Sequence, residues 1–135
     1  MLIDTSILIP IFRDKSGSRR DRFRRFLRGR PFVLSRFTQL ELLQGCSSEP
    51  QWENLNDYLD AQDYIEMAPE NWADAARIHF DLKRKGLTVR SIIDCCIAQI
   101  AIDRRVTLVH NDNDFEVIER VRKIRLHRLD IQAKE

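Results

Sequence analysis

Short apolar runs alternate along the chain with longer segments in which apolar residues recur at helical spacing. The apolar runs predict buried strands over Met1–Asp4, Pro31–Ser35, Tyr64–Ala68, Val106–His110 and Ile124–Leu129. The periodic segments predict helices over Ser6–Arg13, Ser18–Arg28, Arg36–Cys46, Gln51–Ala61, Glu70–Lys85 and Ser91–Arg104, with a short helix from about Asp112. Because strands and helices alternate, a parallel sheet covered on both faces is expected. The predicted fold class is therefore α/β, with three layers (α/β/α) and a central, mostly parallel sheet.

The length and composition are those of one folded domain. The chain has 135 residues, of which 43% are hydrophobic and 33% are charged, and this balance supports a buried core and argues against disorder. We expect a single domain over residues 1–135. No apolar run approaches the roughly 18 residues that span a bilayer, and the first residues lack the basic and apolar regions of a signal peptide. The sequence therefore predicts a cytoplasmic protein that does not enter a membrane.

Disulfide and zinc chemistry are not indicated. The three cysteines, Cys46, Cys95 and Cys96, are odd in number and form no Cys-x-x-Cys pair, and the three histidines do not cluster in the sequence. Buried free thiols on helix faces are therefore expected, rather than a disulfide framework or a structural zinc site.

Charge is strongly segregated along the chain, although the net charge is only +2. Residues 13–30 hold eight arginines, one lysine and two aspartates, which is a net charge of +7. Residues 49–81 hold nine acidic residues and one arginine, which is a net charge of −8. The basic segment is either a solvated helix surface or a surface that binds the phosphates of a nucleic acid. For the second case we predict RNA contacts from Arg19, Arg20, Arg24 and Arg25.

Five acidic residues are candidates for a ligand site, which in such a fold is expected beyond the carboxyl ends of the strands. Asp4 ends the first predicted strand, Asp112 and Asp114 follow a later one, and the other two acids, Glu41 and Asp94, lie on helices. Helix capping is an alternative role for Asp4, Asp94 and Asp112, and a half-exposed helix position is the alternative for Glu41. Asp94, however, lies within an apolar run, where an unpaired charge costs several kcal/mol.

A divalent cation is the most economical way to neutralise these acids together. Three basic residues would otherwise be needed, and Arg36 and Arg90 are the nearest candidates. Mg²⁺ and Mn²⁺ prefer oxygen ligands, and they activate a water and stabilise charge on a phosphate. The sequence shows no Ser-His-Asp or Cys-His arrangement, and its four glycines form no phosphate-binding loop. We therefore predict metal-assisted phosphodiester hydrolysis with Mg²⁺ or Mn²⁺.

Four motifs, in this order along the chain, resemble those of PIN-domain ribonucleases, and specifically of the VapC-type toxins of bacterial toxin–antitoxin pairs. They are Ile3-Asp4-Thr5-Ser6, Thr38-Gln39-Leu40-Glu41-Leu42-Leu43-Gln44-Gly45, Asp94-Cys95-Cys96-Ile97-Ala98 and Val109-His110-Asn111-Asp112-Asn113-Asp114-Phe115. Each motif alone is only weakly specific for this family. The four together are more specific, because they occur in the right order and spacing and cover essentially the whole chain.

The resemblance implies a PIN-like fold with an acidic metal site formed by Asp4, Glu41, Asp94 and Asp112. It also implies that Asp114 is an additional metal ligand and that the hydroxyl of Ser6 supports the site. His110 stands where the family commonly has Thr or Ser, two residues before the fourth acid, and we expect it to end a strand rather than to hydrogen-bond an acid. The family further implies an RNA substrate, a homodimer and a VapB-like antitoxin that inserts a segment near the active site.

Three other functions compete with this one. A non-catalytic PIN-like module that binds protein or nucleic acid is expected to have lost at least one acid, whereas this chain has them all. A phosphoacceptor receiver domain needs two adjacent acids after its first strand and a lysine near its last strands, and the sequence shows neither. A DNA-directed nuclease with the same metal site stays open, because phosphate contacts carry little information about the sugar.

Overall fold

The computed structural model describes residues 1–132 and has a small parallel sheet at its centre. Strands β1 (Leu2–Ile3), β2 (Leu108–His110) and β3 (Leu126–Arg128) are hydrogen-bonded in the order β1-β2-β3. Both pairs are parallel. Because the connections between parallel strands must cross over, the helices are carried to the two faces of the sheet.

Two of the five predicted strands are reduced to isolated bridges. Leu2 pairs with Val33, and Leu34 pairs with Tyr64, so parallel pairing continues on the other side of β1. The first of these segments starts at Pro31, which has no N–H to donate, and ends at Ser35, the N-cap of the next helix, so only three residues lie between them. The strands predicted over Pro31–Ser35 and Tyr64–Ala68 are therefore too long.

All seven predicted helices are present, with ends that differ from the prediction by at most two residues. They are α1 (Thr5–Arg13), α2 (Ser18–Leu27), α3 (Arg36–Gln44), α4 (Glu49–Asp60), α5 (Asn71–Arg84), α6 (Ile92–Arg104) and α7 (Asn113–Glu119). Five of them begin at a side chain that accepts a backbone N–H of the first turn, from Asp4, Ser35, Ser48, Ser91 and Asp112. Such caps fix where a helix starts and how its first side chains point.

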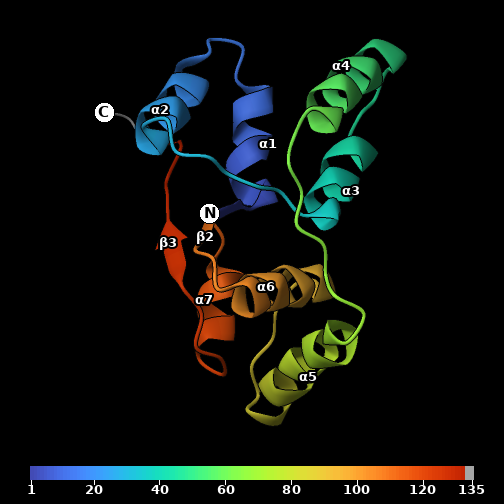
Figure 1. Ribbon diagram of the computed structural model, residues 1–135, viewed down its shortest axis with the longest axis vertical. Coiled ribbons are helices and arrows are strands. Elements are labelled where there is room, and N and C mark those ends of the chain that lie inside the picture. Colours follow the sequence, from blue (N-terminus) through green and yellow to red (C-terminus); the bar gives the residue numbers. More distant parts are fainter. Residues whose placement is uncertain (133–135) are drawn as a thin grey trace.

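Alternate strand residues divide the core into two halves, as the period of a β-strand requires. Leu2 and Leu108 pack with apolar residues of α5, α6 and α7, whereas Ile3 and Val109 pack with apolar residues of α1 to α4. Figure 1 shows these two groups of helices on opposite sides of the strands. The predicted three-layer α/β/α arrangement is confirmed.

Two further predictions about the core and the surface can be compared with the structure. All three cysteines are free. Cys95 and Cys96 are buried in α6, as expected, whereas Cys46 is half-buried and follows the end of α3. Within residues 1–132, no helix is both long enough and apolar enough to cross a lipid bilayer.

Candidate metal centre

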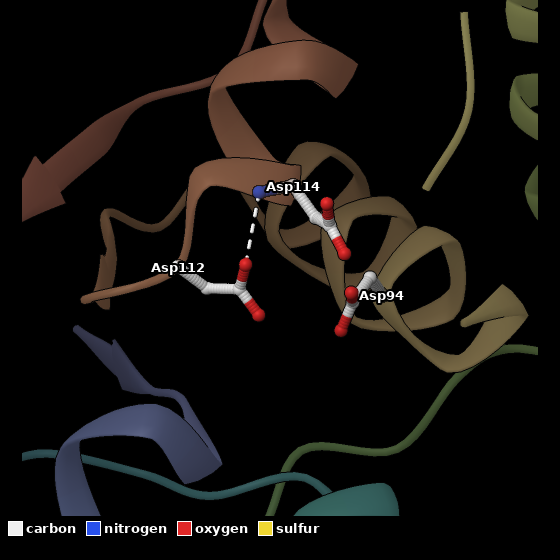
Figure 2. Close-up of side chains that lie close together, drawn as sticks. All are labelled: Asp94, Asp112 and Asp114. Atoms are coloured by element: carbon white, nitrogen blue, oxygen red, sulfur yellow. Dashed lines mark hydrogen bonds between the residues drawn. The ribbon is translucent and has the colours of Figure 1, made fainter. Parts of the chain in front are cut away.

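Three aspartates converge at the carboxyl edge of the sheet, where β2 ends (Figure 2). Asp94 lies in the first turn of α6, Asp112 is the N-cap of α7, and Asp114 lies in the first turn of α7. One carboxylate oxygen from each lies within 4.8 Å of the others. The N–H of Asp114 donates to Oδ1 of Asp112 at 2.9 Å, so the helix cap holds the Asp112 carboxylate against the first turn of α7. The three carboxylates are close enough to share one cation.

Asp4 approaches the same centre from the end of β1. Its Oδ2 accepts the Ser6 N–H at 3.0 Å and the Ser6 hydroxyl at 2.6 Å. The hydroxyl oxygen of Ser6 in turn accepts the N–H of Asn111 at 2.9 Å. Ser6 therefore connects the acid at the end of β1 to the loop that follows β2.

Glu41 is held by Thr5, which in turn contacts Thr38, and the sequence did not reveal the part of either threonine. The hydroxyl of Thr5 donates to Oε1 of Glu41 at 3.0 Å, and it also lies 3.2 Å from the hydroxyl of Thr38. Both threonines are buried, while Glu41 is half-buried on α3. A signal was present, because Thr5 directly follows Asp4 and Thr38 lies one turn before Glu41 on the same helix face.

The pKa values show that these acids interact. Burial, followed by the charges of Asp4, Asp112 and Asp114, raises the pKa of Asp94 to about 8. The pKa of Asp4 is raised to about 6, mainly by burial and against the hydrogen bonds from Ser6. Burial and the charge of Asp112 raise the pKa of Glu41, against the hydrogen bond from Thr5. Carboxylates that resist ionisation in one another's presence are suited to a hard dication, which would relieve their repulsion.

Arg90 neutralises part of the cluster. Its Nη2 lies 2.8 Å from Oδ1 of Asp112, and its Nε and its backbone N–H donate to Oδ2 of Asp114 at 3.2 and 3.0 Å. Arg36, the other candidate from the sequence, instead pairs with Glu66 at 3.3 Å and does not serve this site. Within residues 1–132, the other three acids have no arginine or lysine partner.

His110 ends β2, as expected, and it also contacts the backbone of an acid. Its Nδ1 accepts the N–H of Asp112 at 3.1 Å. The ring is 1% exposed, and burial lowers its pKa. The imidazole therefore stays neutral at physiological pH and keeps its acceptor nitrogen turned to the loop that carries the acids.

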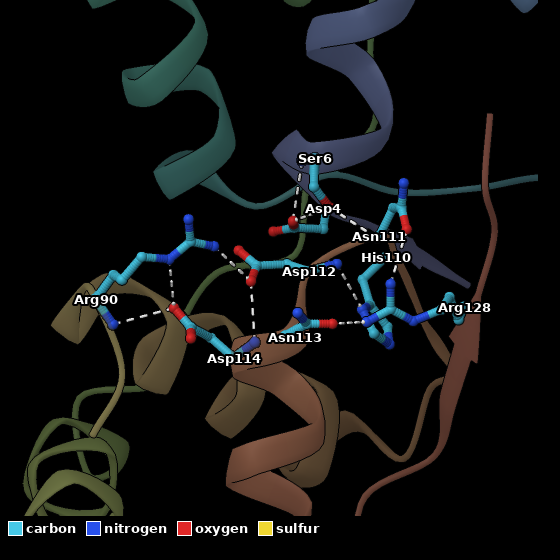
Figure 3. A network of polar contacts seen from close by, with 9 residues as sticks. All are labelled: Asp4, Ser6, Arg90, His110, Asn111, Asp112, Asn113, Asp114 and Arg128. Carbon is cyan, nitrogen blue, oxygen red and sulfur yellow. Dashed lines mark hydrogen bonds and ion pairs between the residues drawn. The ribbon is translucent and has the colours of Figure 1, made fainter. Parts of the chain in front are cut away.

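Arg128 of β3 is a second support of this loop, and it was not foreseen (Figure 3). Its guanidinium donates to the side-chain oxygens of Asn111, Asn113 and Glu116 at 3.0, 2.5 and 2.8 Å. The first two of these residues flank Asp112 on either side. The planar, five-donor guanidinium suits such a multiple contact.

The four arginines predicted to contact RNA are spread over different sides of α2. Arg19 is half-buried and lines a pocket that also includes Asp112. Arg20 and Arg24 line a separate apolar groove of about 560 Å³ between α1, α2 and α4, and Arg25 is exposed. Of these four side chains, the structure therefore brings Arg19 to the acidic cluster.

Comparison with known proteins agrees with this geometry. The PIN-domain profile matches residues 1–121. "Ribonuclease VapC11" of Mycobacterium tuberculosis and "VapC ribonuclease Mb1587" of Mycobacterium bovis are each 31% identical over 124 residues, which span 90% of this chain and 92% of each relative.

Solved structures show the same fold at lower identity. The VapBC2 complex of Rickettsia felis, bound to a promoter DNA fragment, matches with a TM-score of 0.74 and 20% identity over 96% of this chain and 98% of that chain. DNA-bound VapBC of Salmonella typhimurium matches with a TM-score of 0.71 and 24% identity over 94% and 96%. Taken with the profile match and the two curated relatives, the order and geometry of the acids show that this chain belongs to the PIN-domain family, among its VapC ribonucleases.

Proposed function

We propose that this protein is a metal-dependent endoribonuclease and the toxin of a type II toxin–antitoxin system. The observation that carries the proposal is the cluster of Asp94, Asp112 and Asp114 at one edge of the sheet. Asp4 and Glu41, from other parts of the chain, lie near enough for the charge of Asp112 to raise the pKa of each. Its curated relatives are named ribonucleases. A binding module without catalysis has no need of a costly acidic cluster, and such a module is the weaker alternative.

The acids divide into metal ligands and a proton acceptor. Asp4, Asp94, Asp112 and Asp114 would hold Mg²⁺ or Mn²⁺, since carboxylate oxygens are the ligands that these hard ions prefer. A bound dication activates a water and stabilises the charge that develops on the phosphate. Glu41 has its Oε1 engaged by Thr5, and its raised pKa makes it a better base for a proton of the attacking water.

A cleavage assay with matched variants tests this function. The purified protein is expected to cut a mixed RNA pool with Mg²⁺ or Mn²⁺, and EDTA is expected to stop the reaction. Asp4→Asn and Asp94→Asn should each abolish cleavage while circular dichroism shows a folded chain. Asp103→Asn, an exposed aspartate on the same helix as Asp94, is the control that should retain activity. Cleavage by both site variants would refute the assignment, and preference for DNA of the same sequence would favour a DNA-directed nuclease.

The assembly is proposed on the same grounds. Several solved neighbours are described as VapBC or other toxin–antitoxin complexes, and we propose a VapB-like antitoxin as the partner of this chain. Large apolar side chains are exposed at Leu40, Trp52 and Trp72, and such residues support association into a homodimer. A cytoplasmic location remains a prediction of the sequence. Light scattering on the purified chain tests the dimer, and co-purification with the co-expressed antitoxin tests the partner.

A further inference from the structure

A pocket of about 460 Å³ opens beside the acidic cluster and is rich in arginine. Its lining includes Pro10, Arg13, Arg19, Arg90, Asn111 and Asp112. One wall therefore belongs to α1 and the start of α2, and the other wall to the loop between β2 and α7. Because Asp112 belongs both to the lining of this pocket and to the aspartate cluster, the pocket adjoins the proposed metal site directly.

The guanidinium of Arg19 is held in place at this pocket. Its Nη1 donates to the carbonyl of Pro10 at 3.2 Å, and its backbone N–H donates to Oδ2 of Asp14 at 2.9 Å. The Pro10 carbonyl lies in the last turn of α1, where carbonyls lack a partner within the helix. A guanidinium has five N–H donors, and the bond to Pro10 occupies one of them. The others are available to a ligand.

The charge of the pocket is positive. The guanidinium of Arg90 is already matched by Asp112 and Asp114. Among residues 1–132, Arg13 and Arg19 take part in no ion pair. Two uncompensated arginines thus lie next to a site that itself attracts a cation. A ligand that fits the pocket and the metal site together must place a negatively charged group at the two arginines while another of its groups lies at the acids.

We propose that Arg13 and Arg19 bind a phosphate of the RNA strand adjacent to the phosphate that is cleaved. A nucleic-acid strand carries a repeating series of such anions, and arginine is the side chain best suited to contact them. The proposal rests on the proposed ribonuclease function, and it adds a subsite that fixes how the strand crosses the acidic cluster.

Salt-dependent binding measures each phosphate contact separately. A fluorescein-labelled single-stranded RNA of mixed sequence is titrated with the full chain carrying Asp94→Asn, so that the RNA stays intact, and anisotropy is followed at several NaCl concentrations. Arg13→Ala and Arg19→Ala are each compared in this background. Arg84→Ala, an exposed arginine of α5 on the other side of the sheet, is the control for lost charge. Arg19→Lys keeps the charge and is the conservative variant.

We expect each alanine variant at the pocket to weaken binding about three- to tenfold and to flatten the slope of log K against log salt by up to about 0.7, the value for the one phosphate that both arginines contact. Arg19→Lys should keep most of the slope, and Arg84→Ala should keep all of it. Unchanged slopes in both Arg13→Ala and Arg19→Ala would overturn the subsite. Cleavage by the unmodified chain is assayed in parallel. RNA cleavage with unchanged slopes would refute only the subsite, and flattened slopes without cleavage would refute only the nuclease function. Absence of RNA binding would refute both.

Discussion

Asp94→Asn is expected to make the metal-free protein more stable at neutral pH while it removes activity. Asp94 is 8% exposed and its pKa is raised from 3.8 to about 8. Between these two pH values the folded chain holds a proton that the unfolded chain has released. Stability therefore falls as pH rises through this interval. Asparagine has a similar shape and no charge, so it removes this penalty.

The size of the effect follows from the pKa difference. At pH 7 the unfolded carboxyl is ionised and the folded one is largely protonated, which costs the folded state about 4 kcal/mol. Since the neighbouring acids share part of this repulsion, we expect Asp94→Asn to raise the free energy of unfolding by roughly 2–4 kcal/mol. For a domain of this size, that is a rise in Tm of about 10 °C.

Thermal and urea unfolding in EDTA, at pH 4 and at pH 7, measure this prediction. The gain should appear at pH 7 and shrink to about 0.6 kcal/mol at pH 4, where the unfolded carboxyl has itself taken up part of its proton. Asp103→Asn, exposed on the same helix, should change stability little at either pH. Addition of Mg²⁺ should stabilise the unmodified chain more than Asp94→Asn, since binding to the folded state adds to its stability. A loss of stability in Asp94→Asn at pH 7 without metal would refute the reasoning.

The remaining predictions concern the side chains that hold the acids in place. Arg128→Ala removes three hydrogen bonds to residues around Asp112. Calorimetry should therefore show Mn²⁺ binding weakened about five- to tenfold, and unaltered Mn²⁺ binding would contradict a positioning role of Arg128. Ser6→Ala should lower stability by about 1 kcal/mol and raise the pKa of Asp4, because the hydroxyl hydrogen bond that favours its ionised form is lost while the backbone N–H bond stays; a lowered pKa of Asp4 in an NMR titration would have the wrong sign. Arg90→Gln should destabilise the metal-free chain at pH 7, because Asp112 and Asp114 lose their cationic partner. Mg²⁺ should narrow the difference in Tm between this variant and the unmodified chain. A difference in Tm that Mg²⁺ does not change would contradict the idea that Arg90 and Mg²⁺ offset the same negative charges.

The sequence allowed much of the fold to be predicted, because the relevant signals are local. Apolar periodicity located all seven helices, and the capping residues indicated where several of them begin. The two short bridges near Val33 and Tyr64 were predicted as full strands. Their length depends on how the neighbouring helices and β1 limit the pairing, and an apolar run alone does not carry that information.

The acids of the site could be predicted, whereas most of their supports could not. Asp4 and Asp112 lie at strand ends, and strand ends are visible in the sequence. The contact of Thr5 with Glu41 joins residues 36 positions apart, and Arg128 reaches residues up to 17 positions away. Such pairs are set by the packing of α1 against α3 and of β3 beside β2. For the same reason Arg36, close to Glu41 in sequence, was wrongly considered a neutralising residue.

The central claim is that acids from separate segments bind one or two dications together, and calorimetric titration with Mn²⁺ tests it most directly. Two variants change carboxylates that do not belong to the three aspartates within 4.8 Å of one another. Asp4→Asn changes the carboxylate at the end of β1, and Glu41→Gln changes the carboxylate on α3. The unmodified chain should bind Mn²⁺, and Asp4→Asn should weaken binding at least about tenfold, with a smaller loss for Glu41→Gln. Binding by Asp4→Asn with the affinity of the unmodified chain would show that the acid at the end of β1 takes no part, and would contradict the account.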